Sequence, residues 1–317
     1  MSSNIKAHTA LLITNLIYGA NYSIAKEVMP EYIEPFGFIL LRVIGALLLF
    51  WLFHKMFVAE KVASKDLLKL AICGVFGVAI NQLLFFKGLN ITTPINAAII
   101  MTSNPIMVLL FAAFMLKEAI TGKKLAGIVL GLTGAVFLIV FGKDMSFTND
   151  PFGPNGFLQC FAFGSDNLTG NLFILINSAS YGIYLVLVKP LMAKYSPLTV
   201  IKWVFFFGLL YVLPFGYGEF TKVNWVDMPF IIWMAVLFVV LATTFIAYLL
   251  NIFALKQVSP TVVSYYVYLQ PLLASAIAMF FGKDELSLIK IVSVVFIFMG
   301  VYLVSSSTSA VKQQKPN

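Results

Sequence analysis

Residues 102–118 read TSNPIMVLLFAAFMLKE, an almost wholly apolar stretch that contains Pro105 and ends in charged residues. A second stretch, LQPLLASAIAMFFGKDE at 269–285, repeats this arrangement around Pro271. Proline removes a backbone hydrogen-bond donor and clashes with the carbonyl four residues earlier in a helix. We therefore expect Pro105 and Pro271 to kink two related helices near the middle of a membrane.

The composition predicts that the whole chain is built for a bilayer. Of its 317 residues 61% are hydrophobic and 11% are charged. Apolar runs of roughly 20 residues match a hydrocarbon core of about 30 Å, where the backbone must satisfy its own hydrogen bonds. The sequence thus predicts an all-α polytopic membrane protein. About ten transmembrane helices are expected, near 8–25, 36–57, 67–87, 95–116, 124–141, 170–189, 198–217, 228–254, 261–281 and 286–305.

The two halves of the chain repeat each other. ITNLIYG at 13–19 aligns with INSASYG at 176–182, and TTPINAA at 92–98 aligns with VSPTVVS at 258–264. Each copy holds five spans, an odd number, so the second copy is inserted upside down. Inverted repeats that can each take two packings are the basis of alternating access in transporters. The predicted organisation is a first five-helix repeat at 1–142, an extracytoplasmic linker at 143–169, a second repeat at 170–306 and a cytoplasmic tail at 307–317.

The distribution of lysine predicts the orientation. Thirteen lysines fall on the side of the two termini, and six fall on the opposite side together with most of the acidic residues. Positive residues favour the cytoplasmic side, so both termini are expected there. The net charge of +8 then reflects membrane orientation, and no nucleic-acid partner is expected. We predict a multi-pass protein integral to the cell (inner) membrane, with the lipid bilayer and a small-molecule substrate as partners.

Features of spans 4, 5, 9 and 10 resemble a known family. Spans 4 and 9 carry the two prolines and close on Glu118 and on Asp284-Glu285, and the next span reads LAGIVLGLTGAVFLI in the first copy. With its five-plus-five spans, the chain resembles the drug/metabolite transporter superfamily, most closely the EamA-type permeases. The resemblance implies a ten-helix secondary transporter without ATP-driven parts, often an exporter of amino acids or other small metabolites.

Polar side chains inside the spans are the candidate lining of a substrate cavity. Intramembrane polar groups are costly and face the bundle interior, although simple hydrogen bonds between helices explain some of them. Further polar residues of the same spans are Asn21, Asn177, Thr243, Thr244 and Asn251. The predicted substrate-binding residues are Asn15, Tyr18, Asn81, Gln82, Asn104, Tyr181, Tyr184, Tyr248, Tyr265, Tyr268 and Gln270. Tyr265 and Tyr268 are preferred over Tyr266 because positions i and i+3 share a helix face.

Two basic residues, Arg42 and Lys202, lie inside spans 2 and 7. Either their side chains extend to the lipid headgroups, or each is a fixed positive charge on an access path for a carboxylate or phosphate group. In span 5, Gly127 and Gly131 form a face for close helix packing. The sequence leaves open whether that face packs within one chain or between the two chains of a homodimer.

Other classes of protein fit less well. An intramembrane enzyme needs a metal or acid–base cluster, and the two histidines, His8 and His54, fall at span edges without paired acids beside them. No glycine-rich nucleotide loop is present, so neither enzymatic activity nor a cofactor is expected. The sequence predicts a secondary-active transporter of small metabolites that works by alternating access. A channel-like facilitator or a lipid flippase of the same fold is the alternative, and saturation with counter-exchange would identify the carrier.

Overall fold

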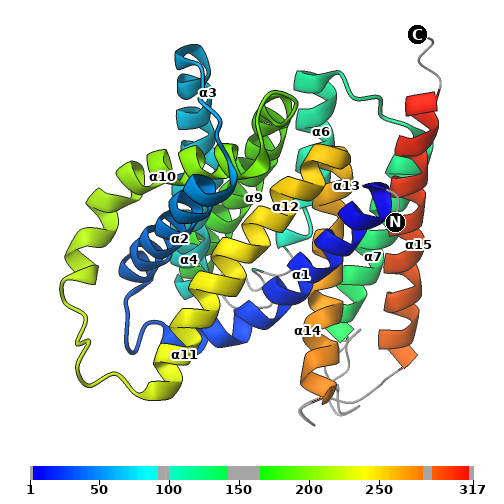
Figure 1. The fold of residues 1–317 in the computed structure, drawn as a ribbon. Helices are drawn as coiled ribbons and strands as arrows, with labels where there is room; N and C mark the ends of the chain where they lie inside the picture. The colour runs from blue at the N-terminus through cyan, green and yellow to red at the C-terminus, as the bar shows by residue number, and fades with distance from the viewer. Residues whose placement is uncertain (1–2, 92–96, 98–99, 142–164, 281–287, 314–317) are drawn as a thin grey trace, which may run out of the picture.

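The computed structural model describes residues 3–91, 97, 100–141, 165–280 and 288–313 (Figure 1). Most of the predicted linker and both acidic residues 284 and 285 lie outside these ranges. Every regular element within them is a helix. The elements are α1 (Ser3–Val28), α2 (Pro35–Phe57), α3 (Ser64–Gly74), η1 (Val75–Ala79), α4 (Ile80–Ile91), α6 (Asn104–Leu116), α7 (Gly122–Phe141), α9 (Ser165–Met192), α10 (Pro197–Phe220), α11 (Phe230–Phe238), η2 (Val239–Ile246), α12 (Ala247–Gln257), α13 (Pro260–Tyr265), η3 (Tyr266–Tyr268), α14 (Leu269–Phe280) and α15 (Leu288–Gln313).

These elements group into the expected ten spans, which confirms the all-α membrane architecture. Span 3 is α3, η1 and α4, span 8 is α11, η2 and α12, and span 9 is α13, η3 and α14. Five helices are long and apolar enough to cross a bilayer by length and composition, among them 64–91 and 230–257. α6 is shorter because span 4 is interrupted before Asn104. α15 continues as helix to Gln313, through most of the predicted tail.

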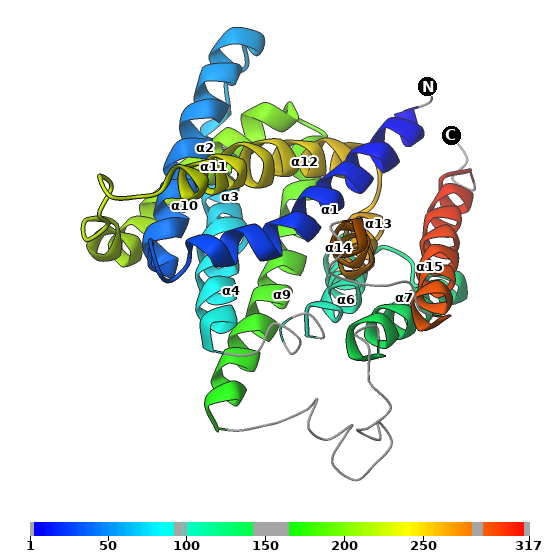
Figure 2. The ribbon, with the colours of Figure 1, turned by 90° about the horizontal axis from the view of Figure 1, so that it is seen from below.

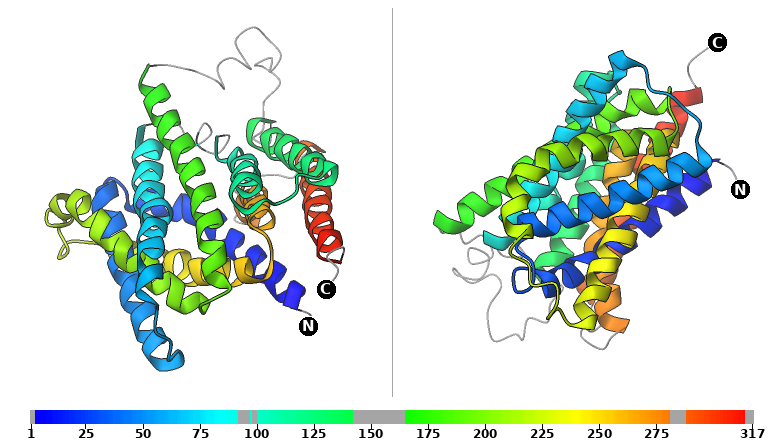
Figure 3. Two further views of the ribbon diagram at one scale, coloured as in Figure 1. Left: turned by 90° about the horizontal axis from the view of Figure 1, so that it is seen from above. Right: turned by 60° about the vertical axis from the view of Figure 1, so that its left-hand side comes forward.

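The helix contacts obey the symmetry that the internal repeat predicts. The main contacts between the halves come in symmetric pairs: when each span is replaced by the equivalent span of the other half, the new pair of spans is also in contact. α4 packs on α9 as α12 packs on α1, and α6 packs on α9 as α14 packs on α1. The pairs α2 with α10 and α7 with α15 each join equivalent spans. Figure 3 shows α4 and α9 side by side, and Figure 2 shows α7 beside α15 at one edge of the bundle.

Each half has a π-helix at the same place, a feature without a sequence signature. η1 interrupts span 3 and η2 interrupts span 8. Both spans are 28 residues long, from 64 to 91 and from 230 to 257. A π-helix shifts the backbone hydrogen bonds from i+4 to i+5, so some carbonyls become free for side chains, and such segments frequently occur at functional sites.

Pro105 and Pro271 lie beside helix breaks and not inside continuous helices. Thr102 and Ser103 form a turn, and Pro105 is the second residue of α6. Pro271 is the third residue of α14, directly after the 3₁₀ segment η3. Proline is tolerated in the first turn of a helix because the N–H that it lacks has no intrahelical partner there. The breaks therefore lie just before the prolines, where the sequence interpretation had placed a kink in an unbroken helix.

The first residues of α1 and the last of α15 lie on the same side of the bundle (Figure 2). By the alternation of the spans, the connections after α2, α6, α9 and α12 share this face, which is called the terminal face below. The connections after α1 and α10 lie on the opposite face. The two faces lie at opposite ends of the spans.

Candidate functional site

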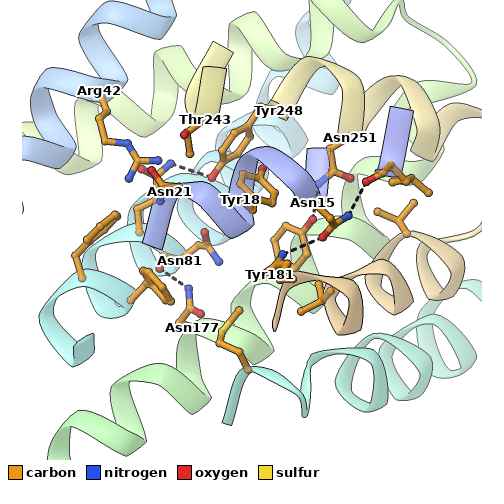
Figure 4. Close-up of a pocket in the computed structure, with 18 residues that line it drawn as sticks. Asn15, Tyr18, Asn21, Arg42, Asn81, Asn177, Tyr181, Thr243, Tyr248 and Asn251 are labelled. Carbon is orange, nitrogen blue, oxygen red and sulfur yellow. Dashed lines mark hydrogen bonds between the residues drawn. The ribbon is translucent and has the colours of Figure 1, made fainter. Parts of the chain in front are cut away.

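A cavity of about 120 Å³ lies at the centre of the bundle, among spans of both halves (Figure 4). This volume holds several water molecules or a small organic group, since one water needs roughly 10–15 Å³ on the same measure. α1, α4, α9 and α12 supply most of its wall, and these are the spans that pair across the two halves. Its lining residues are Leu11, Asn15, Tyr18, Asn21, Arg42, Asn81, Gln82, Phe85, Phe86, Met101, Asn177, Tyr181, Thr243, Tyr248, Asn251, Val263, Val267 and Gln270.

Equivalent hydrogen bonds tie the wall together in the two halves. The Asn177 side-chain amide donates to the carbonyl of Asn81 at 2.5 Å. At the matching positions, the Thr14 hydroxyl donates to the carbonyl of Ala247 at 3.5 Å. Both acceptors lie just beyond a π-helix. Spans 1 and 6 are thus anchored to the backbone of spans 8 and 3 by side chains from the same position of the repeat.

A second symmetric pair connects the broken spans to their neighbours. The Gln270 amide donates to Asn15 Oδ1 at 3.0 Å, and the Asn104 amide donates to the Ser178 carbonyl at 3.0 Å. Asn104 and Gln270 each directly precede a proline of the repeated motif. These amides therefore hold the helix breaks of spans 4 and 9 against spans 6 and 1.

Two hydrogen bonds in the cavity wall connect side chains of different spans. Gln82 Nε2 donates to the Tyr248 hydroxyl at 3.0 Å, and Asn251 Nδ2 donates to the Tyr181 hydroxyl at 2.6 Å. Figure 4 shows both bonds around the central space. Because each tyrosine hydroxyl accepts from an amide, its own hydrogen is available to a second acceptor.

Arg42 enters the cavity from α2 (Figure 4). Its side chain is 4% exposed, its Nε donates to the Thr244 hydroxyl at 3.2 Å, and its guanidinium carbon lies 5.0 Å from the Phe86 ring centroid. An arginine that extended to headgroups would be exposed at the helix end. The Arg42 side chain is instead buried and lines the cavity.

Many of the predicted site residues meet at this cavity, and others do not. Asn104 faces the Ser178 backbone, and the Tyr184 ring packs on Gly77 of η1. Tyr265 and Tyr268 pack edge to face, with ring centroids 4.9 Å apart, beside the glycines of α7. The predicted residues that line the cavity are Asn15, Tyr18, Arg42, Asn81, Gln82, Tyr181, Tyr248 and Gln270.

The Tyr265 hydroxyl donates to the carbonyl of Gly127 at 2.6 Å, where α7 meets α15. A Cβ atom on Gly131 or Gly300 would lie within 2 Å of this hydroxyl. The small-residue face of span 5 therefore packs within the chain, against Tyr265 and α15. Tyr265 and Tyr268 therefore lie away from the cavity. Gly131 has no side chain, and this leaves room for the two rings to pack close to the backbone of α7.

Lys202 lies near the terminal face and does not line the cavity. Its side chain is 7% exposed, and its amine lies 4.9 Å from the Trp51 ring and 5.4 Å from the Trp203 ring. The amine also lies 3.2 Å from Nδ1 of His54. The lysine is thus enclosed by aromatic rings between α2 and α10.

Some lining residues were missed by the sequence analysis. Asn21, Asn177, Thr243 and Asn251 line the cavity but are not among the predicted substrate-binding residues. Of these four, only Asn21 has a predicted site residue, Tyr184, at the equivalent position of the other half, so the repeat could have found Asn21 but not the others. The apolar lining by Phe85, Phe86, Met101, Val263 and Val267 carries no signal in so apolar a chain.

Side chains on the terminal face join the two halves. Asp66 accepts hydrogen bonds from Lys194 at 3.1 Å and from the Tyr195 hydroxyl at 2.9 Å. Glu60 accepts from the Ser196 backbone N–H at 3.0 Å. Burial acts to raise the pKa of the Glu60 carboxyl, but hydrogen bonds from Thr199 and Ser196 outweigh it and leave the pKa below its ordinary value.

On the opposite face, one carboxylate oxygen of Glu219 accepts from the N–H groups of Phe36 at 2.7 Å and Gly37 at 2.9 Å. These are the first free donors of α2, where a negative charge is also stabilised by the helix dipole. Glu60 makes the equivalent contact at the start of α10 on the terminal face. Each half thus supplies an acid that accepts a backbone hydrogen bond at the start of the second span of the other repeat.

The inverted halves and the central polar cavity between them define an integral membrane protein of the transporter class. The sequence model of the EamA-like transporter family matches residues 5–140 and again residues 168–306, and the chain belongs to this family.

Relatives of the chain carry transporter names. An uncharacterized transporter of Archaeoglobus fulgidus is 25% identical over 309 residues, which cover 96% of this chain and 98% of the relative. The "Probable terminal-alkyne amino-acid exporter" of Streptantibioticus cattleyicolor is 25% identical over 151 residues, 48% of this chain and 44% of the relative. A crystal structure of a protein with 16% identity aligns with a TM-score of 0.74 and covers 98% of both chains, which shows the shared fold.

Proposed function

We propose that this protein is a secondary-active carrier that exports small organic metabolites by alternating access. The observation that carries the proposal is the central cavity, which lies between equivalent spans of two inverted halves. It contains polar side-chain atoms that have no hydrogen-bond partner among the described residues. Such a site can face either side of a membrane when the halves exchange their packings. Export, a position in the cell membrane and cytoplasmic termini complete the proposal, with support from the lysine distribution and from the name of the exporter relative.

Alternating access requires that contacts between the halves form and break in turn on the two faces of the protein. On the terminal face, Asp66 and Glu60 join the first half to the second. On the opposite face, Glu219 joins the second half to the first. Opening the cavity toward one face requires the contacts of that face to separate, while those of the other face hold the halves together.

Counterflow in proteoliposomes tests the carrier mechanism. Candidate solutes come from metabolite profiles of cells that overexpress the protein, compared with cells that lack it. Vesicles loaded with excess unlabelled solute should accumulate labelled solute transiently and saturably. Flux that rises linearly with concentration and shows no counter-exchange would indicate a channel, and movement of labelled lipid without solute would indicate a flippase. Either result would overturn the proposal.

A further inference from the structure

Among the described residues, the cavity contains a positive charge that no acidic lining residue balances. Within the part of the chain that the structure describes, Arg42 is the only charged residue that lines it. Its described contacts are a neutral hydroxyl and an aromatic ring. Charged side chains inside a membrane are costly and usually mark a path for substrate or ions. A buried charge without an acidic partner in the described lining is therefore poised to bind an anion.

The Arg42 guanidinium has N–H groups that its described contacts do not use. Nε donates to Thr244, whereas Nη1 is buried and has no hydrogen-bond partner among the residues that the structure describes. Guanidinium presents five N–H groups in a planar fork, which matches the two oxygens of a carboxylate. The free edge of Arg42 can thus take an oxygen acid without losing the bond that holds the side chain.

The π-helix of span 8 fixes the position of this fork. The Thr244 hydroxyl donates its single hydrogen to the Val239 carbonyl at 2.7 Å, at the start of η2. The hydroxyl oxygen must therefore be the acceptor for Arg42 Nε. A helix irregularity in the second half of the chain thereby orients a cation from the first half.

The remaining unpaired atoms are oxygens. The oxygen of Asn177 is buried without a partner, and its orientation is fixed because the amide nitrogen of that side chain donates to a carbonyl. Unpaired oxygens also occur on Asn21, Gln82 and Asn251, and on the hydroxyl of Thr243. Amide oxygens accept hydrogen bonds and repel a second anion. They suit amine, amide or hydroxyl groups of a ligand.

We propose that the cavity binds an organic monocarboxylate, with its carboxylate on Arg42 and its hydrogen-bond donors on these amide oxygens. The inference rests on the proposed function and names the class of solute. A dianion would need a second cation, which the described lining lacks. Phe85 and Phe86 supply an apolar wall, which favours an organic body over an inorganic ion.

Ligand-induced stabilisation of the purified protein tests the inference without transport. The probes are benzoate, 3-phenylpropionate and 4-methylpentanoate, each compared with its neutral amide and with the corresponding amine at pH 7. Sodium chloride and sodium phosphate at matched ionic strength are the inorganic arms. At least one carboxylate should raise the melting temperature at concentrations tenfold or more below its amide and amine. Equal shifts by acids and amides, no shift by any acid, or a shift by the inorganic anions alone would overturn the proposal.

Variants locate the carboxylate. Arg42→Gln should weaken the stabilising carboxylate by at least tenfold and leave the effect of its amide unchanged. Arg42→Lys keeps the charge but loses the fork, so it should recover only part of the affinity. Lys202→Gln removes a buried charge outside the cavity and serves as the matched control, with affinity retained. Equal losses in Arg42→Gln and Lys202→Gln would contradict a site at Arg42. If Arg42→Gln does not fold, the preference of the unmodified protein for acids over amides decides.

The carrier function and the carboxylate site at Arg42 can be contradicted independently of each other. Preference for a carboxylate without counterflow of that compound would keep the binding site and remove the carrier function. Counterflow of a neutral or cationic solute that is unaffected by Arg42→Gln would keep the carrier and remove the anion site. Chloride flux alone would remove both.

Discussion

The Gln82 side chain donates a 3.0 Å hydrogen bond to the Tyr248 hydroxyl, and the two residues occupy the same position of the repeat. They lie 166 residues apart, on spans 3 and 8, shortly after η1 and η2. The bond therefore joins the two halves close to their axis of symmetry. At these two symmetric positions the repeat has diverged into a donor and an acceptor that meet at the cavity.

We expect Tyr248→Phe to destabilise the protein, because it leaves a buried amide donor of Gln82 without a partner. The cost of such a group is about 1–3 kcal/mol. Gln82→Leu in the same background removes the unpaired amide and should restore part of the loss. Melting temperatures of the two single variants and the double variant measure this coupling. Strict additivity of the two single effects would contradict the interaction.

Pro105→Ala and Pro271→Ala should each reduce transport several-fold without loss of membrane insertion. Alanine restores a backbone N–H at the helix break, so the helix can continue through the turn that separates its two parts. Pro35→Ala is the matched control. Pro35 is the first residue of α2 and follows an extended residue, so its replacement should leave transport unchanged. Initial rates of counterflow, corrected for the amount of protein in the vesicles, check the comparison. Equal rates in all three variants would show that the breaks form without proline.

The sequence predicted the spans and the repeat well because both depend on local and repeated signals. Apolar runs of bilayer length identify helices directly. The motif around Pro105 recurs around Pro271, and this recurrence indicates two related irregular helices, although it predicts kinks where the structure has breaks. Polar residues inside spans predicted much of the cavity, since such groups avoid lipid.

The remaining features depend on packing that a single sequence does not display. A π-helix needs one shifted hydrogen bond, and neither η1 nor η2 has a residue pattern of its own. Helix periodicity predicts that Tyr265 faces the cavity. It turns toward α7 instead, because Gly131 and Gly300 leave space for its ring. Glycines on spans 5 and 10 therefore determine which face of span 9 points toward the cavity.

Gly300→Ala should destabilise the junction of α7 and α15. The added Cβ would lie 1.7 Å from the Tyr265 hydroxyl and 2.6 Å from the Gly127 carbonyl oxygen. Overpacking of this kind costs about 1–3 kcal/mol. Gly218→Ala, in α10, is the matched control, since nothing lies within 4 Å of its added Cβ. A lower melting temperature in Gly300→Ala, with an equal or higher one in Gly218→Ala, is expected. Equal stability of both variants would contradict the close packing.

The proposed orientation is tested with single cysteines in a background that lacks Cys73 and Cys160. Ser64, at the start of α3, and Asn224, in the connection after α10, are exposed on opposite faces. Asn224→Cys should react with an impermeant thiol reagent added to intact cells, and Ser64→Cys should react only after the cells are opened. The reverse pattern would place both termini outside the cell.

The contacts of Asp66 should control access to the cavity from the terminal face. Its carboxylate binds Lys194 and Tyr195 of the second half, so Asp66→Asn weakens a connection that must separate when this face opens. The probe is Val263→Cys, a lining position, in the cysteine-free background. Labelling from the terminal face, identified by the Ser64→Cys control, should become several-fold faster in Asp66→Asn. Lys69→Gln is the matched variant, because the Lys69 amine lies 3.7 Å from the same carboxylate but belongs to the same helix as Asp66. It should leave the rate unchanged, and equal labelling rates in the two variants would show that these contacts do not limit opening.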